Sequence, residues 1–269
     1  IFSKVICGLI GFFISVSVAR YLNVSNFGIY TFVIFFIGLL RGLVDLGMDP
    51  LIVQDITVEK DKERLFVGNM LFIKFFLAVL TTIVAMAIIQ IMRYPLSTRI
   101  LVYFSTLVFF STAIISSGVV LKAYLKMSFY ALSEIISAVI LLIWALLLIF
   151  FKADLIHFVI AWTMAEVLKG VFIFLFSQRL VNPSYALNIE VLRSIFKRSL
   201  PIGLGAILIS GYYYIDTVML YRMKGDYSVG LYGASGKILS FLIFIPYAIM
   251  ISVFPLLAKK YVSHKENFR

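Results

Sequence analysis

Residues 20–30 read RYLNVSNFGIY, and a degenerate copy, RMKGDYSVGLY, stands at residues 222–232. Both copies contain Arg, seven further residues, Gly, an aliphatic residue and Tyr, and residue numbers in the second copy exceed those in the first by 202. Each copy lies between two long apolar segments. The repeat therefore predicts a chain built from two similar helical bundles.

The composition indicates that lipid is the solvent of this chain. Apolar residues make up 62% of it and charged residues 14%, and the mean hydropathy is +1.06. A soluble domain has about 45–50% apolar residues. The net charge of +11 would indicate a nucleic-acid partner in a soluble chain. In a membrane protein basic residues report topology first, so we expect no nucleic-acid partner.

Apolar segments long enough to cross a bilayer predict an all-α, polytopic transmembrane bundle of about eight helices. An even number of helices separates the two copies of the repeat, so both copies have the same orientation and the repeat is parallel. Small residues in the first helix should let neighbouring helices approach closely. The expected helices span about 4–22, 27–54, 65–92, 97–121, 129–151, 155–177, 199–221 and 228–258.

The longest polar connection divides the expected helices into a six-helix lobe at 1–178, a linker at 179–200 and the first two helices of a second lobe at 201–269. Ser199 is the expected N-cap of the seventh helix, with Pro201 in its first turn. The chain begins with Ile1 and stops in a charged stretch, so we expect it to be a piece of a longer protein.

The distribution of basic residues predicts the orientation. Connections on the side of the N-terminus contain 14 Lys and Arg residues, against 6 on the other side. By the positive-inside rule, the N-terminus and the linker are cytoplasmic, and the protein is a multi-pass protein of the cytoplasmic membrane. Both copies of the repeat then face the outside.

Two stretches of sequence resemble a known family. ARYLNVSNFGIYTFVIFFIGLLRGLVDLGMDPLIVQDI, residues 19–56, resembles the opening of the bacterial oligosaccharide flippases of the polysaccharide-biosynthesis family. YYYIDTVMLYRMKGDYSVGLYGASGKI, residues 212–238, is similar to the start of the second lobe in that family. The resemblance is a pattern of helices with a few diagnostic residues: Arg20, Gly28, Tyr30, Asp45, Gly47, Asp216, Gly230 and Tyr232.

The resemblance implies two six-helix lobes around a central cleft and export by alternating access. The implied cargo is an undecaprenyl-diphosphate-linked oligosaccharide, with membrane lipids and glycan polymerase or assembly proteins as partners. Multidrug extruders belong to the same superfamily, so a cation-coupled drug extruder is the alternative. A membrane-embedded scaffold or enzyme of glycan assembly is a further alternative.

Charged residues within the expected helices are the first candidate site residues, because a charge inside a bilayer needs a partner or a water-filled cavity. Arg41, Asp45 and Asp49 recur every four residues and share one helix face. Asp45 and Lys74 each lie about nine residues from the cytoplasmic ends of neighbouring expected helices, which predicts a contact between them.

These charges have two interpretations. They neutralise one another and lock the helices together, or Arg41 and Lys74 face the cleft and attract an anionic cargo. Glu166 and Lys169 are expected to form a local pair, being three residues apart. Asp216 and Lys237 lie toward the outer halves of the last two helices, and Lys237 is a further candidate contact for the cargo.

The repeat itself supplies the second group of candidates. If the helices that carry Arg20 and Arg222 line the cleft, as the resemblance implies, the two guanidinium groups face its outer mouth and can bind a diphosphate. The alternative is that both side chains extend to the lipid headgroups and cap their helices. We expect the repeated glycines, Gly28 and Gly230, to permit tight turns and the repeated tyrosines, Tyr30 and Tyr232, to lie in the aromatic belt.

Residues for enzyme chemistry are few. His157 and His264 are the two histidines, and the expected topology places them at opposite ends of the membrane. Asp45 and Asp49 could hold Mg²⁺ as a carboxylate pair, but Arg41 beside them opposes a cation. The sequence therefore predicts a transporter, with no catalytic residue, cofactor or metal site.

Overall fold

The structure is a computed structural model that describes residues 2–184 and 186–263, with side chains described from Ser3 to Lys237 except at 185, and at Leu239. In this described part the chain is helical, with no strand. The α-helices are α1 (Phe2–Tyr21), α2 (Val24–Asp45), α3 (Met48–Val58), α4 (Glu63–Ile91), α5 (Leu96–Ser105), α6 (Leu107–Ile115), α7 (Val119–Ala123), α8 (Met127–Phe150), α9 (Leu155–Gln178) and α10 (Ile189–Ser263). Short 3-10 helices occupy Lys60–Lys62 and Ser116–Gly118.

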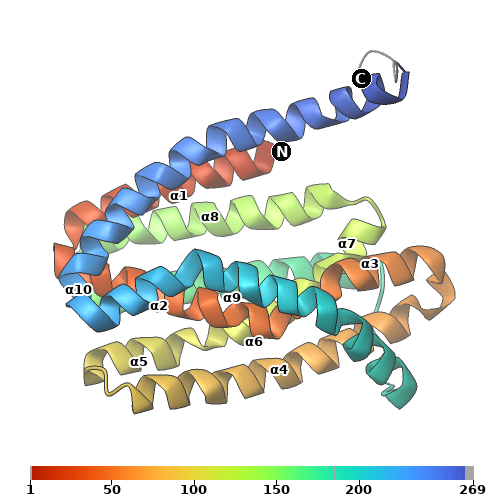
Figure 1. Cartoon of the computed structure of the whole chain (residues 1–269), viewed down its shortest axis with the longest axis horizontal. Coiled ribbons are helices and arrows are strands. Elements are labelled where there is room, and N and C mark those ends of the chain that lie inside the picture. The colour runs from red at the N-terminus through yellow and green to blue at the C-terminus, as the bar shows by residue number, and fades with distance from the viewer. Residues whose placement is uncertain (1, 185, 264–269) are drawn as a thin grey trace.

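Seven helical segments of the described chain are long and apolar enough to span a membrane. Two of them are composite, because α2 with α3 and α5 with α6 and α7 each make one crossing. The last helix, α10, reverses its direction at Gly225, so its two arms occupy the places of the seventh and eighth expected helices (Figure 1). Gly225 has φ 80° and ψ −174°, a conformation that residues with a side chain avoid. The all-α polytopic bundle predicted from the sequence is confirmed.

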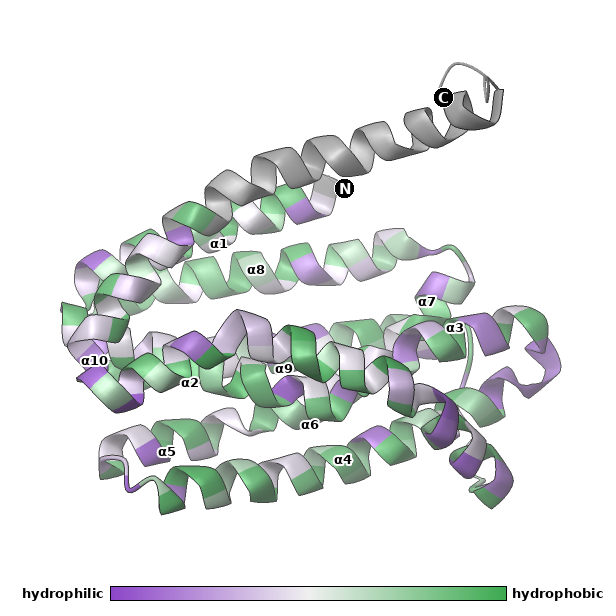
Figure 2. Cartoon of the chain, in the orientation of Figure 1, coloured by the Kyte–Doolittle hydropathy of each residue, from purple (hydrophilic) through white to green (hydrophobic). Residues whose placement is uncertain are grey.

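We call the end of the bundle that holds the N-terminus the inner end and the end that holds Gly225 the outer end. In Figure 1 the inner end is on the right, together with the α3–α4 connection and the start of α10. Hydrophobic residues cover most of the bundle, and hydrophilic residues concentrate near its two ends (Figure 2). This is the pattern of a protein that spans a bilayer.

The second expected helix, 27–54, is interrupted in the structure. Asn23 caps α2 by accepting a hydrogen bond from the backbone N–H of Asn26 at 2.8 Å, so the helix begins before the predicted residue. It ends because Leu46 and Gly47 both adopt left-handed conformations, with φ 43° and 64°. The chain then continues as α3. The expected helix 97–121 is likewise divided, at Thr106 and at Ser116–Gly118.

The predicted start of the seventh helix, near Ser199, was wrong. The Asn188 side chain accepts hydrogen bonds from the backbone N–H groups of Glu190 at 3.0 Å and Val191 at 3.1 Å, and it is the N-cap of α10. Ser199 and Pro201 therefore lie within the helix, and the helix covers the second half of the expected linker. The division of the chain into two lobes at this linker stays a prediction.

Helix α2 is the centre of the packing. It lies against α10 along its length and also contacts α4, α5, α6 and α9, while α1 packs mainly on α8, and α8 on α9. Side chains that α2 buries in the core include Phe32, Phe36 and Ile37, each at most 1% exposed. Phe32 stacks on Tyr221 of α10 with ring centroids 4.0 Å apart, which fixes the outer half of α2 on α10.

Candidate functional site: a cleft below a crossing of the two repeats

The two copies of the repeat meet at the outer end. A Cβ atom added to Gly28 of α2 would overlap the backbone of Asp226 in α10 and lie 2.9 Å from the amide nitrogen of Gly230. A Cβ atom added to Gly230 would overlap the backbone of Val24 and lie 2.9 Å from its Cγ1 atom. Asp226 corresponds to Val24 in the repeat, as Gly230 does to Gly28, so the contact is symmetric. The structure therefore brings the two expected repeats into backbone contact.

The symmetry continues inward along both helices. A Cβ atom on Gly233 would lie 2.8 Å from the Thr31 side chain, and the Lys237 Nζ atom lies 5.9 Å from the centroid of the Phe35 ring. Both pairs again differ by 202 in residue number. Because equivalent residues face one another and α2 runs in the same direction as α10 beyond Gly225, a local two-fold axis passes between the two helices. We call this contact the outer crossing.

The outer crossing corrects two expectations about the repeat. Gly28 and Gly230 lie inside helices and permit a close approach of two backbones, not a tight turn. Tyr30 is 8% exposed and packs in the core instead of the aromatic belt. Tyr232 is 44% exposed, and its hydroxyl donates a hydrogen bond to the carboxylate of Asp216.

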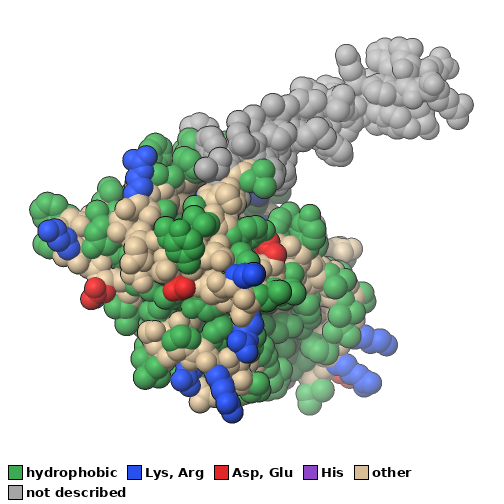
Figure 3. All heavy atoms as spheres, turned by 60° about the vertical axis from the view of Figure 1, so that its left-hand side comes forward, with side chains coloured by type: hydrophobic (Ala, Val, Ile, Leu, Met, Phe, Trp, Pro, Cys, Tyr) green, Lys and Arg blue, Asp and Glu red, His purple; other side chains and the backbone are tan. Residues whose placement is uncertain are grey.

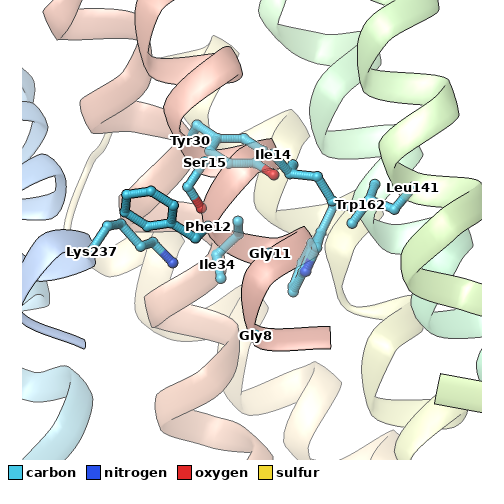
Figure 4. Close-up of a pocket in the computed structure, with 10 residues that line it drawn as sticks. All are labelled: Gly8, Gly11, Phe12, Ile14, Ser15, Tyr30, Ile34, Leu141, Trp162 and Lys237. Atoms are coloured by element: carbon cyan, nitrogen blue, oxygen red, sulfur yellow. The ribbon is translucent and has the colours of Figure 1, made fainter. Parts of the chain in front are cut away.

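A cavity of about 340 Å³ lies between α1, α2, α8, α9 and α10. Among its ten lining residues Lys237 is the one charged residue (Figure 4). Its side chain extends from α10 toward Phe12 and Ile34. The other lining residues are Gly8, Gly11, Ile14, Ser15, Tyr30, Leu141 and Trp162.

Three small residues of α1, Gly8, Gly11 and Ser15, line this cavity, and no described atom lies within 4 Å of a Cβ atom built on Gly11. At Gly11 the absent side chain therefore leaves space open, while α1 as a whole packs on α8.

A second cavity of about 650 Å³ lies on the other side of Lys237 and shares Ile34 and Lys237 with the first. Its lining is rich in tyrosine, and it includes the carboxylate of Asp216, which binds Tyr232 and the backbone N–H of Thr217 at 2.6 Å instead of Lys237. Lys237 has no ion pair with any residue whose side chain is described. The tyrosines are Tyr212, Tyr213, Tyr214 and Tyr232.

The charged residues of α2 and α4 form a neutralised cluster at the break between α2 and α3. The Lys74 ammonium, which is fully buried, lies 2.7 Å from Asp45, 2.6 Å from Asp49 and 2.6 Å from the Ser116 hydroxyl. The contact of Asp45 with Lys74 predicted from helix depth is confirmed. Because two carboxylates surround Lys74, its charge is not available to a ligand.

A second ion cluster joins α2 to α9. Arg41 lies 3.2 Å from Glu166, and Glu166 lies 2.6 Å from Lys169. The expected pair of Glu166 and Lys169 is confirmed, with Arg41 as a third member that the sequence did not reveal. A cavity of about 290 Å³ between the two clusters is lined by Arg41, Asp45, Asp49 and residues of α6, α8 and α10. In this structure both clusters are paired, as the interpretation of mutual neutralisation requires.

Arg20 and Arg222 are exposed at the outer end, and neither has an ion pair within the described part of the chain. Figure 3 brings the outer end forward and shows Lys and Arg side chains dispersed among apolar ones, more numerous than Asp and Glu. The role of the two arginines at an outer mouth of the cleft stays a prediction.

Among the described residues, no group of three or more His, Cys, Asp and Glu side chains that could hold a metal ion occurs. His157 is exposed near the start of α9, and His264 lies outside the described residues.

The bundle and its cavities define a class of protein. It is a polytopic helical membrane protein in which two repeats cross above central cavities. Among solved structures, the chain is similar to an inward-facing multidrug resistance MATE family transporter of the MOP superfamily, with a TM-score of 0.62 and 17% sequence identity. The similarity covers 86% of this chain and 57% of that one, so the chain spans little more than half of the transporter's length.

The family follows from the sequence itself. The model of the polysaccharide biosynthesis protein family matches residues 1–260, and the chain belongs to that family. No match was found among curated proteins. Family and fold point to transporters rather than to enzymes, the fold is that of a multi-pass membrane protein, and the resemblance noted in the sequence is confirmed.

Proposed function

We propose that the protein is a flippase that moves a lipid-linked oligosaccharide across the cytoplasmic membrane by alternating access. The observation that carries this proposal is the outer crossing, which closes one end of the bundle directly above a cavity with a single cation, Lys237. A transporter in one of its two states has one end closed and a binding cavity near the middle of the membrane.

The cavity suits the head of such a cargo. An undecaprenyl-diphosphate head is anionic, and the Lys237 ammonium can bind its phosphate oxygens. Tyrosine hydroxyls and rings around the second cavity offer hydrogen bonds and flat apolar faces to sugars. The polyprenyl tail stays in lipid, so the protein avoids burial of charged phosphate in hydrocarbon, which costs several kcal/mol per charge.

Opening to the outer side requires the outer crossing to separate. Gly28 and Gly230 have no side chains that interlock at this contact, and the stacked rings of Phe32 and Tyr221 next to it must separate as well. The N-terminus and inner end are cytoplasmic in this proposal, as the distribution of Lys and Arg predicts. The inner side is then the side from which cargo enters.

The test is a flipping assay with the full-length protein in proteoliposomes. A fluorescent undecaprenyl-diphosphate-linked oligosaccharide is incorporated, and a membrane-impermeant quencher reports how fast its head changes leaflet. We expect Lys237→Gln to lower the initial rate about 10- to 100-fold, since a hydrogen bond to a charged group contributes roughly 1.5–3 kcal/mol. Lys237→Arg should retain most of the rate, and the exposed Lys224→Gln variant should retain all of it. Equal rates in wild type and Lys237→Gln would contradict the proposed role of Lys237, and no flipping by the wild type would contradict the function.

A cation-coupled drug extruder is the second candidate, and the aromatic residues of the first cavity, Phe12, Tyr30 and Trp162, favour it. The pairing of Lys74 with Asp45 and Asp49 opposes it, because a coupling ion needs free carboxylates. The same proteoliposomes distinguish the two. Efflux of a cationic dye driven by a Na⁺ or H⁺ gradient, without flipping of the glycan lipid, would establish the extruder.

A further inference from the structure

The first twelve residues of α10, residues 189–200, form a segment that we call the oblique helix. In Figure 1 it runs at an angle to the bundle at the inner end, before the long stretch of α10 that packs on α2. Its position is fixed on one side by Arg198, whose guanidinium donates two hydrogen bonds, of 3.1 and 2.7 Å, to the carboxylate of Asp55 in α3. Ile195 and Ser199 are buried on the same side.

The connection before the oblique helix is fixed as well. Asn69 of α4 is fully buried, and its side chain donates a hydrogen bond to the Ala186 carbonyl at 3.3 Å and accepts one from the Asn188 N–H at 3.1 Å. The Ser184 N–H donates to the Arg64 carbonyl at 2.9 Å. The oblique helix is therefore a rigid projection and not a loose linker.

The outward side of the oblique helix is amphipathic. Ile189, Phe196 and Leu200 are 80%, 43% and 42% exposed, and their spacing of seven and four residues places them in one stripe. Arg193 and Lys197, themselves four residues apart, form the adjacent stripe and are exposed. Neither has an ion pair with a described residue. Hydrophobic and hydrophilic residues lie side by side on this part of α10 in Figure 2.

We propose that the oblique helix lies in the headgroup layer of the inner leaflet and binds anionic phospholipids there. An exposed apolar stripe needs lipid around it, and a basic stripe beside it meets the phosphates of the headgroups. Water alone would leave Phe196 and Leu200 unfavourably hydrated, and hydrocarbon alone would leave Arg193 and Lys197 without counter-charges. The boundary between the two satisfies both stripes at once.

Charge complementarity identifies the partner as an anionic lipid and not a zwitterionic one. A Lys or Arg near an anionic membrane surface contributes roughly 1 kcal/mol, or about a fivefold preference. Arg193 and Lys197 together should therefore give about a 25-fold local preference for an anionic headgroup.

The experiment places a bimane fluorophore on Phe196→Cys in a Cys7→Ser background of the full-length protein. The protein is reconstituted in mixtures of phosphatidylcholine and phosphatidylglycerol, one of which carries brominated acyl chains that quench bimane on contact. We expect quenching by both lipids when each is alone, and about a 25-fold preference for phosphatidylglycerol in mixtures. Bimane on Ser194→Cys, an exposed polar position of the same helix, should be quenched much less.

Two variants test the basic stripe. Arg193→Gln with Lys197→Gln should reduce the preference to near unity, whereas Arg193→Lys with Lys197→Arg should retain it. The exposed outer-end variant Lys224→Gln is the control and should leave the preference unchanged.

Three results would overturn the proposal. Absence of quenching by either lipid at Phe196 would show that protein or water covers the apolar stripe. A preference that survives the double Gln variant would show that other groups select the headgroup. Displacement of brominated phosphatidylglycerol by 1 mol% of undecaprenyl diphosphate would identify a selective site for the cargo head instead of a surface for bulk phospholipid.

Discussion

A single methyl group at the outer crossing should change which side of the protein is open. Gly28→Ala or Gly230→Ala would place a Cβ atom within the backbone of the opposite helix, so α2 and α10 must separate locally. Overpacking of this kind costs about 1–3 kcal/mol. If α2 and α10 separate as rigid helices, both residues stay helical and the higher helix propensity of Ala acts equally on the closed and open states. A loss of about 2 kcal/mol from the closed state shifts the equilibrium roughly 30-fold toward the outer-open state.

The assay uses Thr31→Cys in a Cys7→Ser background. Thr31 is 2% exposed beneath the crossing, and its hydroxyl has no hydrogen-bond partner within the described chain, so replacement by Cys removes no hydrogen bond. Labelling by a membrane-impermeant maleimide from the outer side measures opening. We expect the labelling rate to rise up to 30-fold with Gly28→Ala or Gly230→Ala.

The control for this experiment is Gly211→Ala, a glycine of α10 at which a Cβ atom would have no described atom within 4 Å. It should leave labelling unchanged. The reasoning is refuted if Gly28→Ala and Gly230→Ala leave the labelling rate of Thr31→Cys at the wild-type level, or if Gly211→Ala raises it as much as they do.

Two further predictions concern the helices beside the cleft. Lys74→Met should lower the free energy of unfolding by about 3–5 kcal/mol, because it leaves the Asp45 carboxylate without a cation and leaves Asp49 with Lys122 alone, at 3.6 Å. Addition of Asp45→Asn and Asp49→Asn should recover part of this loss. Thermal unfolding in detergent measures both effects, and equal stability of Lys74→Met and wild type would contradict the role of Lys74. Gly42→Cys with Ser210→Cys should form a disulfide on oxidation, since a Cβ atom on Gly42 would lie 3.4 Å from that of Ser210, close to the 3.5–4.5 Å of disulfides. The disulfide fixes α2 to α10, so glycan flipping should stop on oxidation and return on reduction. Flipping that continues in fully cross-linked protein would show that α2 and α10 do not separate at Gly42 and Ser210 during transport.

Local sequence patterns were enough to predict the helices and one tertiary contact. Segment length and apolar content give the crossings directly, since the bilayer imposes a nearly constant helix length. The contact of Lys74 with Asp45 was predicted from depth in the membrane alone. Residues that are the same number of positions from the same membrane surface lie at the same depth in neighbouring helices. The pair of Glu166 and Lys169 followed from helical spacing.

The close contacts between distant segments could not be predicted in this way. Glycine in a helix near a turn has the same local signature whether it permits a turn or the approach of another backbone, so Gly28 and Gly230 were misinterpreted. The repeat contained the information needed to predict this contact. The same offset of 202 in residue number, applied beyond the repeat, also pairs Phe35 with Lys237. The helix break at Leu46 and Gly47 was not predicted, because Leu has no preference for a left-handed conformation. The surrounding tertiary packing imposes that conformation on Leu46.

The two-fold axis at the outer crossing has a consequence for how the two copies of the repeat can differ in sequence. On such an axis each residue faces its own counterpart, so a duplicated helix pair begins with identical side chains face to face. Two lysines at the level of Phe35 and Lys237 would repel one another in a medium of low dielectric constant. A single positive charge over an aromatic ring, as Lys237 has over Phe35, therefore requires the two copies of the repeat to differ at this position.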